Sequence, residues 1–377
     1  MRIGFDGKRA VQNFTGLGNY SRYVADILCH FYPENDYVLY APKKRENKRM
    51  NLLTGQYRQL TLAYPATSFW KKLSSLWRVW GITSQLEKEG IELFHGLSNE
   101  LPLNIHKSRI KSIVTIHDLI FLRYPQYYQS IDRKIHTYKF RKACENADKI
   151  IAISECTKRD IIRYFNIPDD KIEVVYQGCD VSFTHPVTEE KKEEVRKKYQ
   201  LPDHYILNVG SIEERKNILA AVQALPMLPQ HIHIVIVGRR TGYTEKVEQF
   251  IKDNGLGERV HIISNVPFND LPAFYQSAEI FVYPSRFEGF GIPIIEALYS
   301  GIPVVAATGS CLEEAGGPDS IYVNPDDITG LADAFKQIYS NSDKRKNMVE
   351  KGREFAKRFS EKQQSEEIIN IYKKLIR

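Results

Sequence analysis

The sequence lacks several patterns that would assign it to a particular class of protein. Its five cysteines are scattered without a Cys-x-x-Cys pair, which argues against a zinc site or a disulfide framework and predicts reduced thiols in a cytosolic compartment. There is no uninterrupted apolar run of about 18 residues, so no membrane-spanning helix is expected. The first residues, Met1–Asp6, already read as a strand and leave no room for a signal peptide.

An Asp-x-Asp motif is also missing. Such paired carboxylates are a common way of holding a divalent cation against phosphates, so the sequence supports neither a metal site of this kind nor another cofactor. Bound phosphates would then have to be held by positive side chains and a helix N-terminus. No recognition motif for nucleic acid occurs, and no nucleic-acid partner is expected.

Charge is unevenly distributed along the 377 residues. Residues 1–185 hold 28 Lys+Arg against 19 Asp+Glu, whereas the remainder holds 25 against 27. An asymmetry of this kind suggests that the first half meets an anionic partner. We expect an anionic membrane surface or a phosphorylated acceptor.

Short apolar runs alternate with helical patterns along the whole chain, which predicts two α/β domains with mostly parallel, doubly wound sheets. In the first half, Tyr20 to Phe31 has the spacing of one buried helical face and follows a polar loop over Asp6–Asn19. The expected strands are Arg2–Phe5, Asp36–Tyr40, Ile91–Phe94, Ser112–Ile116, Lys149–Ile153, Ile172–Val175, Tyr205–Val209, His233–Val237, Val260–Ile263, Ile280–Tyr283, Val304–Ala306 and Ile321–Val323.

The most informative stretch follows the strand Ile280–Tyr283. A loop with two glycines, which allows close approach of a ligand, separates this strand from a helix predicted to begin at Pro293. Glu288 falls in the loop and Glu296 in the first helical turn. A helix N-terminus favours bound anions, and a carboxylate accepts well from two neighbouring hydroxyls. The stretch therefore predicts a site for a nucleotide sugar.

Glu288 and Glu296, with seven residues between them, resemble the two-glutamate motif of retaining glycosyltransferases of family 4, which have the GT-B fold. The similarity continues through Gly301–Val305 and Ser310–Glu314. It implies two Rossmann-like doubly wound domains facing across a cleft, with a C-terminal helix crossing back to the N-terminal domain. The implied boundaries are 1–183 for the acceptor-side domain, 184–358 for the nucleotide-sugar-binding domain and 359–377 for the crossover helix.

The resemblance also implies roles for individual residues. Glu296 would hold the ribose diol and Glu288 the transferred sugar. Arg215 and Lys216, which follow Gly210, would hold the donor diphosphate. A structural alternative for these cations is an exposed basic pair. The predicted catalytic residues are His117, Glu288, Arg215 and Lys216, and the predicted donor-binding residues are Gly16, Gly18, Gly210, Arg215, Lys216, Gly289, Phe290, Gly291, Ile292 and Glu296.

His117 directly follows the expected strand Ser112–Ile116. A histidine at the end of a strand is more often a structural one, but the segment Val114–Pro125 is similar to the family's segment whose histidine lies against the donor sugar. Gln177 stands where many family members have asparagine. Gly16 and Gly18 resemble a flexible glycine loop near phosphate and acceptor, although two glycines alone are a weak signal.

These residues together predict a metal-independent retaining glycosyltransferase of polysaccharide biosynthesis. It would move a hexose, mannose before glucose, from a nucleoside diphosphate sugar to a glycan or lipid-linked acceptor. The alternatives are a non-catalytic sugar-nucleotide-binding subunit and a nucleotide-sugar epimerase of similar fold. We expect a cytoplasmic protein that rests peripherally on the inner face of the membrane.

A basic, aromatic segment at 69–80 supports that last expectation. Trp70, Leu73, Trp77 and Trp80 fall on one face if the segment is a single helix, and basic residues lie between them. The same face would serve equally well in the protein core or against the acceptor.

Overall fold

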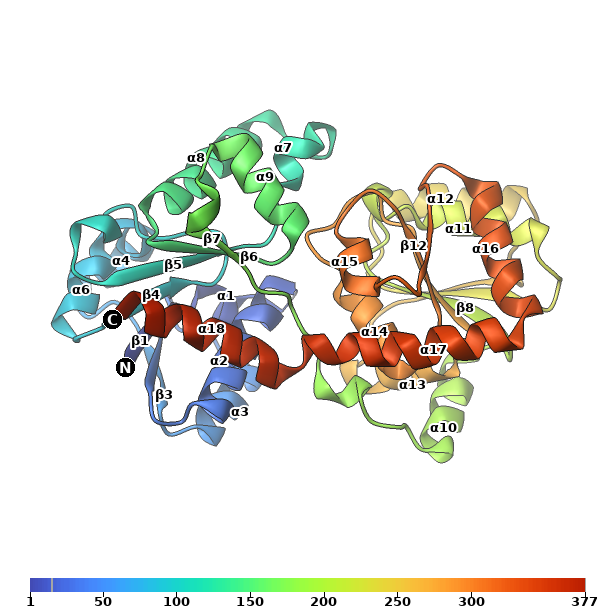
Figure 1. Ribbon diagram of the computed structural model, residues 1–377, viewed down its shortest axis with the longest axis horizontal. Helices are drawn as coiled ribbons and strands as arrows, with labels where there is room; N and C mark the ends of the chain where they lie inside the picture. The colour runs from blue at the N-terminus through green and yellow to red at the C-terminus, as the bar shows by residue number, and fades with distance from the viewer. Residues whose placement is uncertain (15, 377) are drawn as a thin grey trace. The chain divides into compact units, whose positions relative to one another are not determined.

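The structure, a computed structural model, describes residues 1–14 and 16–376. The chain forms two compact units (Figure 1). Unit 1 comprises Met1–Gln177 together with Glu361–Arg377, and unit 2 comprises Gly178–Ser360. Each unit has a parallel sheet with helices on its faces, so the predicted fold class is confirmed.

Unit 1 is built on a 7-stranded sheet of order β3-β2-β1-β4-β5-β6-β7, in which every pair of neighbours is parallel. The strands are β1 (Arg2–Asp6), β2 (Asp36–Tyr40), β3 (Leu60–Ala63), β4 (Leu93–Gly96), β5 (Lys111–Ile116), β6 (Lys149–Ala152) and β7 (Ile172–Val174). Parallel strands covered on both faces read as continuous apolar runs, and the central strands are almost fully buried.

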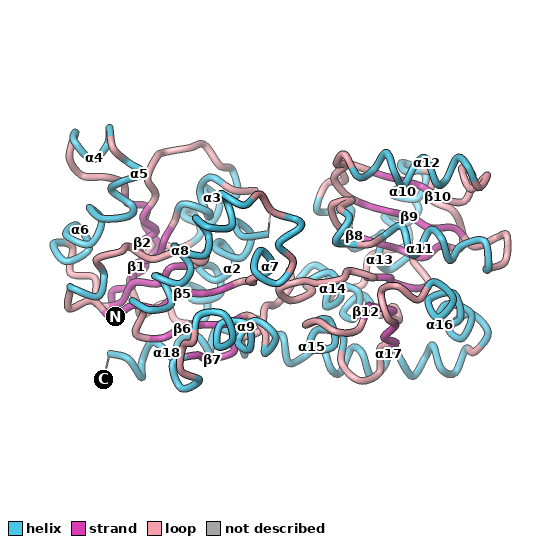
Figure 2. Tube along the Cα trace, turned by 90° about the horizontal axis from the view of Figure 1, so that it is seen from above, coloured by secondary structure: helices cyan, strands magenta, loops and turns pink. Residues whose placement is uncertain are grey.

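Helices follow the strands of unit 1 in alternation (Figure 2). They are α1 (Lys8–Gln12), α2 (Gly16–Phe31), α3 (Lys48–Gln56), α4 (Ser68–Lys72), α5 (Ser74–Leu76), η1 (Trp77–Gly81), α6 (Ile82–Lys88), η2 (Ile105–Lys107), α7 (Ile120–Arg123), η3 (Pro125–Tyr127), α8 (Ser130–Asn146), α9 (Glu155–Phe165), η4 (Asp169–Lys171) and the late helix α18 (Glu361–Ile376). α18 packs beside α2, and its Tyr372 hydroxyl lies 2.6 Å from His95 Nδ1.

Unit 2 repeats the plan on a 6-stranded parallel sheet of order β10-β9-β8-β11-β12-β13. Its strands are β8 (Tyr205–Val209), β9 (His233–Val237), β10 (Val260–Ile263), β11 (Ile280–Tyr283), β12 (Val304–Ala307) and β13 (Ile321–Val323). Its helices are η5 (Val181–Phe183), α10 (Glu189–Tyr199), η6 (Glu214–Lys216), α11 (Ile218–Ala224), η7 (Leu225–Met227), α12 (Tyr243–Asp253), η8 (Phe268–Asp270), α13 (Leu271–Ser277), α14 (Ile292–Ser300), α15 (Leu312–Gly316), α16 (Ile328–Ser340), α17 (Ser342–Ala356) and η9 (Lys357–Phe359).

The structure differs from the sequence-based expectations at several places, among them the following three. Gly16 and Gly18 lie in the first turn of α2 rather than in a loop. A Cβ on Gly18 would come within 2.0 Å of the Asn13 carbonyl oxygen, so this glycine allows close packing of backbone on backbone. The strand β3 was not predicted because Leu60–Ala63 is short and only its first residue is buried.

The third difference concerns the segment 69–80, which is not one helix. It is divided among α4, α5 and η1, so the predicted single face does not form. Trp77 is fully buried, donates from its indole N–H to Gln85 Oε1 at 3.1 Å and belongs to the core of unit 1. The alternative that this tryptophan packs in the core is therefore the correct one.

Candidate functional site

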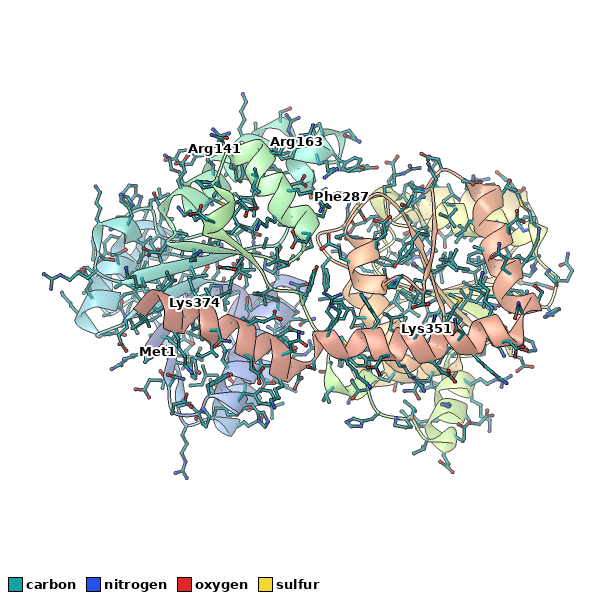
Figure 3. The ribbon with its side chains drawn as sticks, in the orientation of Figure 1. Met1, Arg141, Arg163, Phe287, Lys351 and Lys374 are labelled. Carbon is teal, nitrogen blue, oxygen red and sulfur yellow. The ribbon has the colours of Figure 1, made fainter. Side chains whose placement is uncertain are left out.

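The site in unit 2 is built on the connection between β11 and α14. β11 is buried along its whole length, and the loop that follows carries Phe287, labelled in Figure 3. Gly291 precedes the helix with a backbone φ of 150°, a conformation that residues other than glycine rarely adopt. α14 starts at Ile292, so Pro293 is its second residue rather than its first. The predicted sequence of strand, loop and helix is thus present, displaced by one residue.

Glu288 is the centre of a buried charged cluster in this loop. Arg215 Nη1 lies 2.8 Å and Lys216 Nζ 3.3 Å from its two carboxylate oxygens. Both cations come from η6, the short turn after β8, which the neighbouring strand order places beside the β11 loop. Two segments more than 70 residues apart therefore converge on one carboxylate.

Two hydroxyls complete the contacts of Glu288. Ser285 Oγ donates to its Oε1 at 3.0 Å, and the Tyr283 hydroxyl lies 3.1 Å from the same oxygen. Lys216 Nζ in turn donates to the Tyr283 hydroxyl at 2.9 Å. Burial raises the pKa of Glu288, but Lys216 and Arg215 outweigh burial and lower it to about 2. The carboxylate is therefore ionised at neutral pH.

The backbone holds the two cations in place. The Arg215 guanidinium also donates to the Phe287 carbonyl, and the Arg286 N–H donates to the Arg215 carbonyl at 2.9 Å. Gly210 has φ of 154°, and a Cβ there would lie 3.2 Å from Lys216 Nζ. The predicted glycine is thus placed against the lysine, where a side chain would crowd it.

Glu296 is the fifth residue of α14, just past the first turn in which it was predicted, because the helix begins one residue earlier than expected. It has a different partner from Glu288. Its Oε2 accepts a hydrogen bond of 2.7 Å from the Tyr275 hydroxyl on α13. Tyr275 is fully buried, and its ring packs against Phe183 and Phe281. Burial raises the pKa of Glu296 to about 7, while the Tyr275 hydrogen bond opposes this shift and Asp180 adds to it. Glu296 therefore changes charge near neutral pH.

Sequence reasoning missed two supporting residues of this site. One is Tyr275, which lies 21 positions before its partner in a helix that carries no recognisable motif. The other is Cys311, whose thiol lies 3.1 Å from the Glu288 carbonyl and 2.7 Å from the Phe290 carbonyl. Phe290 itself is buried against Phe359. These contacts fix the loop that carries Glu288.

His117 lies in unit 1 at the end of β5. Its ring is buried, with Nε2 2.9 Å from the Leu97 carbonyl and Nδ1 3.2 Å from Gln177 Nε2. Nε2 therefore carries the proton, and Nδ1 accepts from the amide. Burial lowers the pKa of His117 to about 4, so the ring is neutral at pH 7. Both nitrogens have protein partners here, and contact with a donor sugar stays a prediction.

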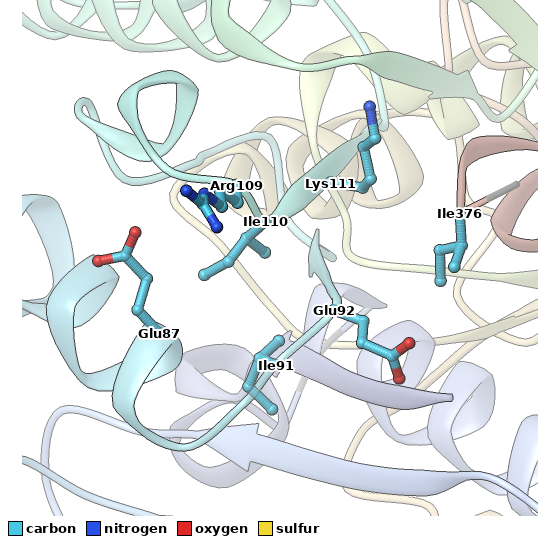
Figure 4. A pocket seen from close by; sticks show the side chains of 7 residues that line it. All are labelled: Glu87, Ile91, Glu92, Arg109, Ile110, Lys111 and Ile376. Carbon is cyan, nitrogen blue, oxygen red and sulfur yellow. The ribbon is translucent and has the colours of Figure 1, made fainter.

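A cavity of about 450 Å³ lies at the amino ends of the unit 1 strands, where β4 and β5 begin (Figure 4). His117 lies at the other, carboxyl end of β5. Glu87, Glu92, Arg109 and Lys111 surround it. Open α/β sheets bind ligands at the carboxyl ends of their strands, so this cavity is not part of the predicted site. Among residues 1–14 and 16–376, no group of three or more metal-ligating side chains is placed to hold an ion. The same residues include no helix long and apolar enough to cross a membrane.

Comparison with known proteins agrees with this geometry. Residues 21–183 match the model of Glycosyltransferase Family 4, and residues 190–355 match that of Glycosyl transferases group 1. O-antigen chain mannosyltransferase B of Escherichia coli is 30% identical over 288 residues, which cover 75% of this chain and 74% of that protein. The chain belongs to glycosyltransferase family 4 and has the GT-B fold.

One further relative and one solved structure are also similar to this chain. O-antigen chain mannosyltransferase RfbU of Salmonella typhimurium is 29% identical over 225 residues, which cover 60% of each chain. The structure of Anabaena HepE in complex with UDP-glucose aligns over the full length of both chains with a TM-score of 0.77 and 16% identity. The first two proteins are named for transfer of mannose, and the third shares the fold.

Proposed function

We propose that this protein is a retaining, metal-independent hexosyltransferase, with mannose as the first candidate for the sugar and glucose as the second. The donor is a nucleoside diphosphate sugar and the acceptor a hydroxyl of a glycan or lipid-linked glycan. Membership of family 4 supports transfer of a sugar, and the similarity to two O-antigen mannosyltransferases supports mannose.

The observation that carries this proposal is the convergence of Arg215 and Lys216 on the loop before α14. Glu288 neutralises one of the two positive charges in the ligand-free protein, and the second carboxylate nearby, Glu213, is more exposed and lies farther from Arg215, at 3.7 Å. A diphosphate brings at least two negative charges, and a guanidinium fork with an ammonium group is well suited to hold them. Preorganised cations in a buried site can stabilise a leaving group without a metal ion.

In the proposed reaction the bond between the anomeric carbon and the diphosphate oxygen breaks, and a bond to the acceptor oxygen forms on the same face. The acceptor proton passes to the departing diphosphate, so no protein base is required. Arg215 and Lys216 take up the charge that develops on the leaving group. Glu296, when ionised, accepts from the ribose diol, and Glu288 contacts the transferred sugar.

We further propose a cytoplasmic protein acting on acceptors at the inner face of the membrane. The five cysteines support this location because all are free and buried, which is typical of a reducing compartment. A lipid-linked acceptor would be met at that membrane surface.

A panel of nucleotide sugars tests the proposal. GDP-mannose, UDP-glucose, UDP-galactose and UDP-N-acetylglucosamine are each incubated with lipid-linked and free oligosaccharide acceptors, and released nucleoside diphosphate is measured. We expect acceptor-dependent release from one donor, with an anomeric configuration in the product that matches the donor by NMR. Release from none of these donors, or a product of inverted configuration, would contradict the proposal. Lys216→Ala serves as the inactive control and Glu213→Gln as the active one.

A further inference from the structure

The break in the segment 69–80 changes which of its side chains face solvent. Trp77 is buried, and the Trp70 ring lies on Gly81, where a Cβ would come within 2.6 Å of it. A different set of large apolar side chains is exposed instead. These are Phe69, Leu73, Leu76 and Trp80, with exposed fractions of 61%, 39%, 51% and 50%.

The helix α8 presents a second row of exposed apolar side chains. Ile131, Ile135 and Tyr138 follow one another at spacings of four and three residues, so they share one face of the helix. Their exposed fractions are 72%, 47% and 55%. Ordinary surface helices do not place three such residues in a row facing water.

A groove lies between η1 and α8. It has a volume of about 340 Å³, and Val79 of η1 lines it together with Ile135 and Tyr138 of α8. Leu101 and Leu103 also line it. We call the seven exposed residues of the two rows the apolar face of unit 1: Phe69, Leu73, Leu76, Trp80, Ile131, Ile135 and Tyr138. Of these, Ile135 and Tyr138 line the groove.

Basic residues accompany both rows. α8 contains five Lys and Arg against two acidic residues, and one of the five, Arg141 (labelled in Figure 3), lies against Phe165 of α9. Lys71 and Lys72 end α4. Within the part of the chain that the structure describes, Lys71, Lys72 and Lys134 form no salt bridge. The acidic Glu100 in the groove is already paired with Arg78 and Lys139.

We propose that the apolar face docks unit 1 on an anionic membrane surface. Aromatic and aliphatic side chains would enter the boundary between headgroups and acyl chains, where tryptophan is favoured. The unpaired lysines would lie at the level of the lipid phosphates. A protein partner is less well matched, because the cores of protein interfaces are depleted in lysine, whereas here lysines alternate with the apolar side chains.

Flotation of the full chain with lipid vesicles tests the proposal. Vesicles of phosphatidylcholine alone are compared with an equal mixture of phosphatidylcholine and phosphatidylglycerol. We expect binding to the mixed vesicles at about 0.01 M salt and much weaker binding at about 1 M salt, where the Debye length falls from about 30 to 3 Å. Lys71→Gln with Lys72→Gln should weaken binding about fivefold per lysine, since each basic residue near such a surface contributes about 1 kcal/mol.

The apolar contribution is tested separately. Phe69→Ser with Trp80→Ser should weaken binding roughly tenfold or more, because each half-exposed ring loses its burial in the interface. The matched control, Leu52→Ser with Met227→Ser, changes residues that are 73% and 43% exposed elsewhere and should bind like the wild type. If the first pair does not fold by circular dichroism, Ile131→Ser, at a position 72% exposed, takes its place.

Three results would overturn the proposal. One is no flotation with the mixed vesicles at low salt. Another is unchanged binding of a folded apolar-face variant, or equal loss in the control pair. The third is a dimer in light scattering that Trp80→Ser dissociates while vesicles are not bound, which would assign the apolar face to a second copy of the chain.

Discussion

Replacing Glu288 by glutamine removes the negative charge that Arg215 and Lys216 share while keeping the shape of the side chain. The three side chains are only 13% to 16% exposed, so solvent screens their interaction little. Glutamine can still accept hydrogen bonds from Ser285 and Tyr283. The substitution therefore tests the charge rather than the packing.

Two opposite effects are expected. Removing the buried anion leaves Lys216 without a carboxylate and Arg215 with only the more exposed Glu213. This should lower the free energy of unfolding by about 3 kcal/mol, as for removal of one partner of a buried ion pair. For a unit of this size that corresponds to a fall in Tm of roughly 6 to 12 °C. A nucleoside diphosphate, however, no longer competes with the carboxylate. Two unit charges about 4 Å apart interact with about 4 kcal/mol at an effective dielectric constant of about 20. If about a third of this energy becomes available to the ligand, the affinity for the nucleoside diphosphate rises about tenfold.

Thermal unfolding and calorimetric titration with GDP and UDP measure both effects at pH 7. Glu288→Gln should melt lower than the wild type, bind the diphosphate more tightly and turn over more slowly, because its contact with the transferred sugar is weakened. Glu213→Gln is the matched control, since its carboxylate lies 3.7 Å from Arg215 and is 37% exposed. It should change stability by less than about 1 kcal/mol. Weaker or unchanged diphosphate binding by folded Glu288→Gln would refute the reasoning.

Other predictions concern the leaving diphosphate and Glu296, the carboxylate proposed to bind the ribose. Lys216→Ala should lower kcat by roughly 10²–10³, as for loss of one preorganised stabilising group. Wild-type activity should survive excess EDTA. Inactivation by EDTA that magnesium or manganese reverses would contradict metal independence. Because the pKa of Glu296 is about 7, the KM for the donor should fall as pH rises from 6 to 8, and Glu296→Gln should give a higher, flat profile in steady-state kinetics. Tyr275→Phe should shift the wild-type profile to higher pH with kcat less affected than KM, since it removes the hydrogen bond that opposes the rise in pKa.

The sign of the Glu296 effect on stability follows from the same pKa. The folded-state value of about 7 lies above the ordinary value of 4.5, so folding favours the protonated form. The stability gained from protonation is fully present below about pH 4.5 and is lost as pH rises through 7. Glu288 behaves in the opposite way, because its pKa is lowered and its contribution is lost as pH falls from 4.5 towards 2. The two glutamates of one motif thus oppose each other in the pH dependence of stability.

The central strands of unit 2 could be predicted closely because they are buried and parallel. Tyr205–Val209, His233–Val237 and Ile280–Tyr283 each form a short, mostly apolar run, and their limits agree with the structure. Unit 1 was predicted less well where burial is partial. Leu60–Ala63 has one buried residue and gave no clear pattern, and the start of α2 at Gly16 was taken for a loop because glycines disfavour helices.

The candidate site shows the same division between local and tertiary information. A loop followed by a helix predicts where Glu288 and Glu296 lie along the chain, but not that Arg215 Nη1 would come within 2.8 Å of Glu288. That contact depends on β8 and β11 being neighbours in the sheet, which no spacing along the sequence reveals. The position of Trp77 in the core likewise depends on a change of helical form at η1.

The contrast between the two glutamates explains why residue type and spacing alone could not give their chemistry. Glu288 lies in the loop before α14 and Glu296 on α14 itself, and both are buried, which by itself raises the pKa of each. Glu288 meets two cations from η6 and stays ionised, whereas Glu296 meets a neutral phenol from α13 and titrates near neutral pH. A charge that is fixed suits a site that must hold a sugar and balance cations at every pH. In the proposed reaction, a charge that responds to pH would make the binding of the ribose pH-dependent. Burial, opposed by the Tyr275 hydrogen bond, determines the pH at which this change occurs.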